Sequence, residues 1–138
     1  MKTTHTYLTC LVILSVMILG ACNNKTDDGP NEASLLTAKG WTIKTVIDQT
    51  NSNTDVTNGF SGKTAQFNSD GTYSHNLGSV TESGSYVFGG NTVTLTPGSG
   101  TPYTASLTEV SVTSTQLTFK VTLNNEKTGS ITYAFTME

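Results

Sequence analysis

From Gly40 to the C-terminus, apolar or β-branched residues alternate with polar ones at a period of two. This period is typical of half-buried β-strands. Eight strands are predicted, and their alternating positions are Trp41, Ile43, Thr45 and Ile47; Ala65 and Phe67; Tyr73, His75 and Leu77; Tyr86 and Phe88; Val93 and Leu95; Tyr103, Ala105 and Leu107; Leu117, Phe119, Val121 and Leu123; and Ile131, Tyr133, Phe135 and Met137. In the sixth strand the phase slips before Val110 and Val112, which predicts a β-bulge near Thr108–Glu109.

Short segments rich in glycine, asparagine and serine separate these strands, among them Asn68–Gly71 and Gly89–Asn91. Successive strands joined by short turns usually pair antiparallel with their neighbours. The sequence therefore predicts an all-β fold, an antiparallel up-and-down meander of about eight strands. Closing the meander into a barrel removes both exposed edges, which favours a barrel. A β-sandwich built from the same strands is the alternative.

One segment before the strands, Glu32–Lys39, has the composition of a short helix. Asn31 is a suitable N-cap, and Gly40 can end the helix. Leu35 and Leu36 are expected to dock it against the sheet. The predicted domain of residues 32–138 thus begins with a short helix.

The first 21 residues have the parts of a secretory signal peptide. Lys2 supplies positive charge, and an apolar stretch follows from Tyr7 to Leu19. This stretch is shorter than the roughly 20 residues that a membrane-spanning helix needs. It ends in Leu19-Gly20-Ala21-Cys22, which resembles a bacterial lipobox. We therefore expect cleavage before Cys22, lipidation of Cys22, and a flexible tether over residues 22–31.

A lipid on Cys22 would anchor the chain in the cell envelope, with the outer membrane as the expected location. Asp27 and Asp28 follow soon after. They resemble the signal by which some Gram-negative bacteria display lipoproteins on the cell surface. A tether that is merely soluble is the alternative explanation of this acidic pair.

The charge of the chain argues against nucleic acid as a partner. The chain has no arginine, the side chain best suited to grip phosphate and guanine edges. Once Lys2 leaves with the leader, six lysines face ten acids, a balance of −4.

Sequence motifs for metal binding or catalysis are weak. His75 is the single histidine after the leader, and a metal site would need further ligands. The turn at Asn68 begins like a calcium loop, but Ser79 stands where that loop needs its twelfth-position glutamate. The acids Glu82, Glu109 and Glu126 fall at or near predicted turns or bulges, where they are expected to keep the surface soluble. We therefore expect no enzyme, metal or cofactor.

Several segments together resemble the bacterial lipocalin-like lipoproteins. They are residues 35–41, 67–73, 84–86 and 91–95, Leu107, and residues 117–119. The resemblance implies a small antiparallel barrel with a helix at one end, closed at its bottom by Trp41. Gly40 and Trp41 are adjacent here, whereas the lipocalin signature separates its glycine and tryptophan by one residue. No arginine is present to pack on the tryptophan.

Two functions fit this fold. In the first, the barrel binds a small hydrophobic or amphipathic ligand. The candidate cavity residues are Trp41, Ile43, Phe67, Tyr73, His75, Tyr86, Phe88, Phe119, Tyr133 and Phe135. In the second, these side chains fill the core, as is usual in a small eight-stranded barrel. The protein would then be a structural or interaction module whose polar loops, such as Asp48–Asn58, contact another envelope component.

Overall fold

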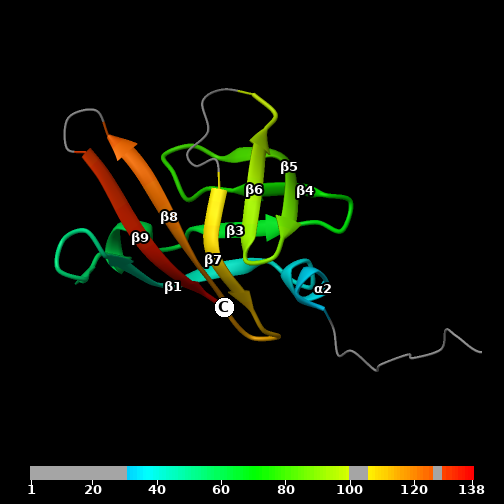
Figure 1. The fold of residues 1–138 in the computed structure, drawn as a ribbon, viewed down its shortest axis with the longest axis horizontal. Coiled ribbons are helices and arrows are strands. Elements are labelled where there is room, and N and C mark those ends of the chain that lie inside the picture. Colours follow the sequence, from blue (N-terminus) through cyan, green and yellow to red (C-terminus); the bar gives the residue numbers. More distant parts are fainter. Residues whose placement is uncertain (1–30, 100–105, 126–128) are drawn as a thin grey trace, which may run out of the picture.

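The computed structural model describes residues 31–99, 106–125 and 129–138 (Figure 1). The predicted leader, Cys22 and the tether up to residue 30 lie outside the described residues. Tyr103, Ala105 and Glu126 lie outside them as well.

The described part of the chain is almost entirely β-structure. Its elements are α2 (Glu32–Leu36), β1 (Trp41–Asp48), β2 (Thr54–Asp55), the 3₁₀ turn η1 (Thr57–Phe60), β3 (Thr64–Phe67), β4 (Thr72–His75), β5 (Glu82–Gly89), β6 (Thr92–Pro97), β7 (Ser106–Val112), β8 (Leu117–Asn125) and β9 (Gly129–Met137). From β3 to β9, each strand pairs antiparallel with the next along the chain.

The sheet closes on itself through β1. This strand pairs with β3 at Trp41 and Thr42 and with β9 from Ile43 onward, where Val46 lies opposite Phe135. The predicted closed barrel of eight antiparallel strands is therefore confirmed, and the sandwich alternative is excluded. The short strand β2 is an addition. It pairs with the end of β1, in a segment that the sequence analysis treated as a loop.

A bulge in β1 changes which of its side chains face the interior. The register shifts between Ile43 and Thr45. After the shift, Val46 and Asp48 are buried, whereas Ile47 is only partly buried on the other face. The prediction that Thr45 and Ile47 share the face of Trp41 is wrong, because one extra residue in a strand reverses every later side chain.

The bulge predicted in the sixth strand is confirmed in β7. The register shifts between Thr108 and Ser111, and Glu109 has a φ of 50°. Leu107 and Val110 are consequently both buried, although three positions separate them.

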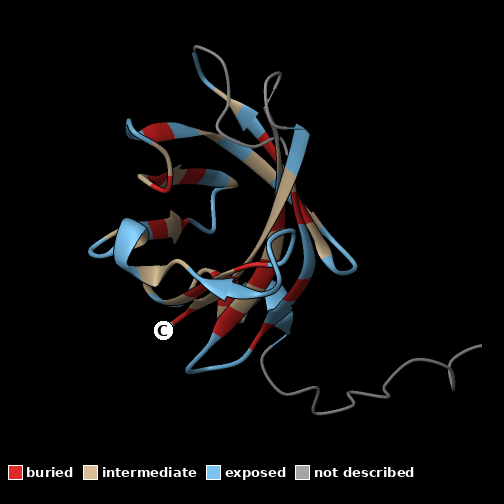
Figure 2. Cartoon of the chain, turned by 90° about the vertical axis from the view of Figure 1, so that its left-hand side faces the viewer, coloured by how far each residue is buried: buried red, intermediate tan, exposed pale blue. Residues whose placement is uncertain are grey.

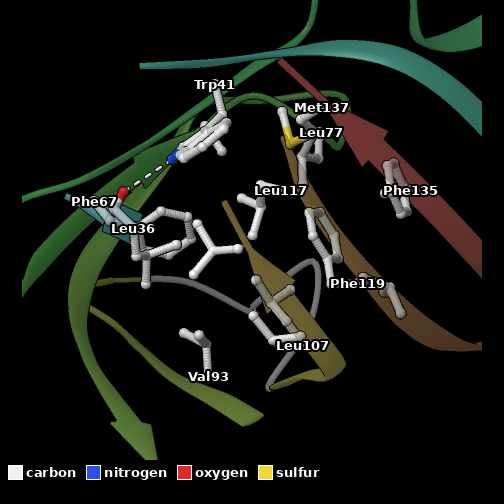
Figure 3. Packing of buried hydrophobic residues seen from close by; sticks show 14 of the residues in the cluster. Leu36, Trp41, Phe67, Leu77, Val93, Leu107, Leu117, Phe119, Phe135 and Met137 are labelled. Atoms are coloured by element: carbon white, nitrogen blue, oxygen red, sulfur yellow. Dashed lines mark hydrogen bonds between the residues drawn. The ribbon is translucent and has the colours of Figure 1, made fainter. Parts of the chain in front are cut away.

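The helix covers one end of the barrel, which we call the helix end. It is shorter than predicted and stops at Leu36, but Asn31 caps it as expected and accepts a 2.8 Å hydrogen bond from the Ser34 amide. Leu36 is fully buried, and its carbonyl accepts a 2.9 Å hydrogen bond from Nε1 of Trp41 (Figure 3). The opposite end, which we call the loop end, carries the β1–β3 connection (residues 49–63) and the β4–β5 connection (residues 76–81).

Buried and exposed residues alternate along the strands (Figure 2). The buried apolar residues form one cluster: Leu36, Trp41, Val46, Ala65, Phe67, Tyr73, Leu77, Val93, Leu95, Leu107, Val110, Val112, Leu117, Phe119, Val121, Phe135 and Met137. Three polar or charged residues, Asp48, His75 and Glu82, are buried with them.

Candidate functional site

Three polar side chains meet inside the apolar barrel, and we call them the Tyr–His–Glu cluster: Tyr73, His75 and Glu82. They are 2%, 4% and 8% exposed. Tyr73 and His75 are two positions apart on β4, so they share its inner face. Glu82 begins β5 directly opposite His75 in the β-ladder. Because β4 ends and β5 begins at the loop end, the cluster lies toward that end.

One carboxylate oxygen joins the cluster. The Tyr73 hydroxyl donates a 2.6 Å hydrogen bond to Oε1 of Glu82, and Nε2 of His75 lies 3.5 Å from the same oxygen. The rings of Tyr73 and His75 lie side by side, with centroids 5.5 Å apart. The cluster is thus a compact polar group with Glu82 as its shared acceptor.

Burial controls the protonation of the two ring-bearing side chains. It lowers the pKa of His75 from its ordinary value of 6.5, although the charge of Glu82 works in the opposite direction. Burial also raises the pKa of Tyr73, and the hydrogen bond to Glu82 and the charge of Glu82 add to this effect. At neutral pH His75 is therefore mainly neutral and Tyr73 keeps its proton.

The prediction that Glu82 lies on the surface is wrong, because its side chain is buried. Its neighbours Thr81 and Ser83 are polar, so the residue looked like part of a turn. A signal was present, because Glu82 is in phase with Tyr86 and Phe88 at a period of two. Because β5 pairs with β4, the side chain of Glu82 lies on the inner face of the barrel beside that of His75. Glu109, in contrast, is exposed as predicted and pairs with Lys120 at 2.7 Å.

A group of aromatic rings lies toward the loop end. Phe60 of η1 meets Tyr133 and Phe135 of β9 edge to face, with ring centroids 5.7 and 5.4 Å apart. Phe60 and Tyr133 are only partly buried, as is Leu123 of β8. Phe60 is absent from the predicted site residues, because a single phenylalanine in a polar connection has no periodic neighbours.

The segment that carries Phe60 (residues 49–63), which we call the strap, is tied to the barrel by several hydrogen bonds. The Val46 amide donates to Oγ1 of Thr57 at 2.9 Å, and Lys63 Nζ donates to the carbonyls of Asn76 and Gly78. At the other end of the strap, the Asp48 carboxylate accepts hydrogen bonds from Asn51, which lower its pKa. The strap is thus held at both of its ends.

The other candidate cavity residues divide between the two ends. Trp41, Phe67 and Tyr86 pack at the helix end, where the Phe67 and Tyr86 rings lie edge to face at 5.2 Å. Phe88 also lies there, beside the turn between β5 and β6. Phe119 stacks on Phe135 at 5.0 Å (Figure 3). Ile43 is partly buried against the core. The structure therefore does not bring all ten predicted residues into one site.

One hollow lies on the outside of the barrel, over β4, β5 and β6. It has a volume of about 640 Å³ and is open to solvent. The side chains that line it include those of Thr72, Ser74, Ser83, Ser85 and Thr96. Hydroxyl side chains and apolar surface, including Pro97, together line this hollow.

Two further observations concern the described residues alone. They contain no group of three or more histidine, cysteine, aspartate or glutamate side chains placed to hold a metal ion. None of their helices has the length and apolar character needed to cross a membrane.

Comparison with known proteins returns no match to this chain, either among protein-family models or among curated proteins.

Proposed function

We propose that this protein is a non-enzymatic binding module that takes a small apolar or amphipathic ligand into the loop end of its barrel. The observation that carries the proposal is the Tyr–His–Glu cluster, a hydrogen-bonded polar group buried inside an apolar core. Ligand sites commonly combine an apolar lining with a few polar groups that orient the ligand.

Burying these polar groups costs folding free energy, so stability alone does not explain their presence in the core. A buried carboxylate loses its hydration, and a well-packed apolar group of similar size often stabilises a fold as well or better. The partly exposed apolar side chains of Phe60, Leu123 and Tyr133 add a second cost at the same end of the barrel. A ligand that covers these groups would reduce both costs.

Binding is favoured over catalysis by the geometry of the cluster. His75 and Glu82 form the kind of pair that general acid–base catalysis uses. However, the Glu82 oxygen already accepts the Tyr73 hydroxyl, and its 3.5 Å separation from His75 exceeds normal hydrogen-bond length. The pair is therefore better suited to holding a polar group than to moving a proton.

The proposal includes a location in the cell envelope, with a lipid on Cys22 holding the barrel at the outer membrane. The lipobox-like tetrad Leu19-Gly20-Ala21-Cys22 supports this location. A closed barrel with a helix at one end is also what the resemblance to the bacterial lipocalin-like lipoproteins implies.

A second candidate function uses the outside of the barrel. The open hollow over β4–β6 supports contact with a partner, such as another component of the envelope. In this case the interior would be a filled core, and the protein would be an interaction module.

Native mass spectrometry of the chain from residue 23 onward would distinguish the two functions, because this part contains every described element. We expect a co-purifying small molecule, or binding of an environment-sensitive fluorescent probe, that Tyr73→Phe weakens. Tyr86→Phe is the matched control, because it removes a hydroxyl that bonds the Asn68 carbonyl at the helix end. An empty protein that also fails to bind the probe would favour the interaction module.

A further inference from the structure

The hollow over β4–β6 carries a regular set of hydroxyl groups on the outer face of the barrel. Thr72 of β4 lies opposite Ser85 of β5, which in turn lies opposite Thr96 of β6. Ser74 and Ser83 form a second opposed pair beside this row. Neighbouring strands lie about 4.8 Å apart, and alternate residues of one strand lie about 6.6 Å apart. The residues that carry these hydroxyl groups therefore cover an area of about 10 by 7 Å.

Several of the polar groups in this hollow are available to a ligand. Asn68 also lines the hollow, and its Nδ2 donates a 2.9 Å hydrogen bond to Oγ1 of Thr72, which donates in turn to Asp70 at 2.6 Å. The Asn68 amide is therefore held in one orientation before any ligand binds. A hydroxyl group can both donate and accept a hydrogen bond. Within the described part of the chain, four lining hydroxyl groups make no hydrogen bond: those of Ser74, Ser83, Ser85 and Thr96.

The lining of the hollow also lacks charge. None of the described residues that line it is a lysine, arginine, aspartate or glutamate. Apolar surface completes the lining, including that of Pro97, which lies opposite Gly84 in the β-ladder. A charged partner would lose hydration in this hollow without gaining an opposite charge. The lining therefore fits an uncharged partner that presents hydroxyl groups and C–H groups side by side.

A protein partner fits this lining less well. β5 pairs with β4 on one side and with β6 on the other, so it offers no free edge to which a peptide strand could add. The strongest contacts of protein interfaces usually come from tryptophan, tyrosine and arginine. Tyr73 is an aromatic lining residue, but it is only 2% exposed.

We propose that the hollow over β4–β6 binds an uncharged carbohydrate. Sugar rings carry hydroxyl groups at their edges and C–H groups on their faces. The rows of serine and threonine would exchange hydrogen bonds with the sugar hydroxyl groups, and Pro97 would contact a C–H face. This inference rests on the second candidate function, the interaction module, and gives its partner a chemical class. It does not depend on a ligand inside the barrel.

Saturation-transfer difference NMR of the full chain in zwitterionic nanodiscs tests the proposal, after subtraction of empty nanodiscs. The probes are the uncharged oligosaccharides cellohexaose, mannohexaose and chitohexaose, with the acidic hexagalacturonate as the charged comparison. We expect at least one uncharged probe to bind with a Kd of about 1 mM, as a few solvent-exposed hydrogen bonds would give. Hexagalacturonate should bind at least about tenfold more weakly, because its charge finds no partner in the hollow.

Two matched double variants place the binding site. Ser85→Ala combined with Thr96→Val removes two opposed hydroxyl groups of the hollow and should raise the Kd at least about fivefold. Ser111→Ala combined with Thr118→Val is the control, because these residues form an opposed pair of β7 and β8, away from the hollow. The control should leave the Kd unchanged. If the first variant does not fold, Ser74→Ala combined with Ser83→Ala tests the same hollow.

The outcomes separate this inference from the function on which it rests. Absence of binding by all three uncharged probes up to about 10 mM would overturn the proposal, and so would tighter binding of hexagalacturonate. Equal Kd values in the two double variants would overturn the assignment of the site to the hollow. If no sugar binds but a photo-crosslinking group in place of Ser85 joins the chain to an envelope protein, the carbohydrate fails and the interaction module stands. If neither result is obtained, both fail.

Discussion

At the scale of single residues, the buried side chain of His75 makes the stability of the protein depend on pH. Because burial lowers the pKa of His75, the unfolded chain takes up the histidine proton first as the pH falls. The stabilisation from a neutral His75 is therefore complete above the unfolded value of about 6.5 and is lost as the pH falls below it.

We expect the urea midpoint of the protein to fall between pH 7.5 and pH 5.5, and to fall less in His75→Gln. The carboxyl groups of Asp48, Asp55 and Asp70 do not change the stability between these two pH values. Their pKa values are lowered from the ordinary aspartate value of 3.8, so they affect stability only near and below that pH. Equal falls in the two proteins would show that His75 does not carry the effect.

Gly84 lies where the neighbouring strand leaves no room for a side chain. A Cβ at this position would lie 2.1 Å from the Thr96 carbonyl oxygen, which belongs to the backbone of the neighbouring strand. Gly84→Ala should therefore lower the free energy of unfolding by about 1 to 3 kcal/mol, the usual cost of overpacking. Gly89→Ala in the same strand is the control, since a Cβ there meets nothing within 4 Å. Chemical denaturation of both variants measures the difference.

At the scale of elements, α2 is stabilised mainly by its docking, because a helix of five residues is too short to persist alone. Leu36 is fully buried, whereas its neighbour Leu35 is partly buried. We expect Leu36→Ala to cost about 2 to 5 kcal/mol of unfolding free energy. Leu35→Ala should cost distinctly less, as thermal or urea unfolding would show. Equal costs would contradict the docking of α2 through Leu36.

The strap is held against the barrel by the ring of Phe60, which packs on the rings of Tyr133 and Phe135. Phe60→Ala should speed amide hydrogen exchange in residues 54–60, because the strap loses its apolar contact with the barrel while the strands keep theirs. Val87→Ala is the control, since Val87 is 71% exposed on the outside of β5. Exchange that rises equally throughout the barrel would show instead that Phe60 stabilises the whole fold.

At the scale of the whole molecule, the proposed anchor makes the location of the barrel depend on one thiol. Cys22→Ser should abolish labelling by a clickable fatty acid and leave the unprocessed chain, because lipid transfer needs the sulfur atom. Cys10→Ser is the control, because this residue lies within the predicted leader, and it should keep both labelling and processing. Unchanged labelling of Cys22→Ser would contradict the proposed anchor.

Much of the architecture could be predicted from local pattern. The eight barrel strands, their antiparallel order and the bulge before Val110 all follow from alternation and turn residues. The bulge in β1 could not be predicted, because Thr45 and Ile47 continue the alternation of Trp41 without a visible break. The burial of Glu82 could not be predicted for a related reason. Its neighbours in the sequence are polar, and only the pairing of Glu82 with His75 decides which face of β5 its side chain occupies.

The sequence by itself determined which segments are strands, because alternation at a period of two and the preference of turn residues act within a few neighbours. It also determined the short helix α2 and its Asn31 cap. Tertiary structure decided which face of β1 is buried, that Glu82 meets Tyr73 and His75, and that Phe60 packs over β9. These outcomes depend on hydrogen-bond register and on contacts between distant segments, which no local pattern specifies.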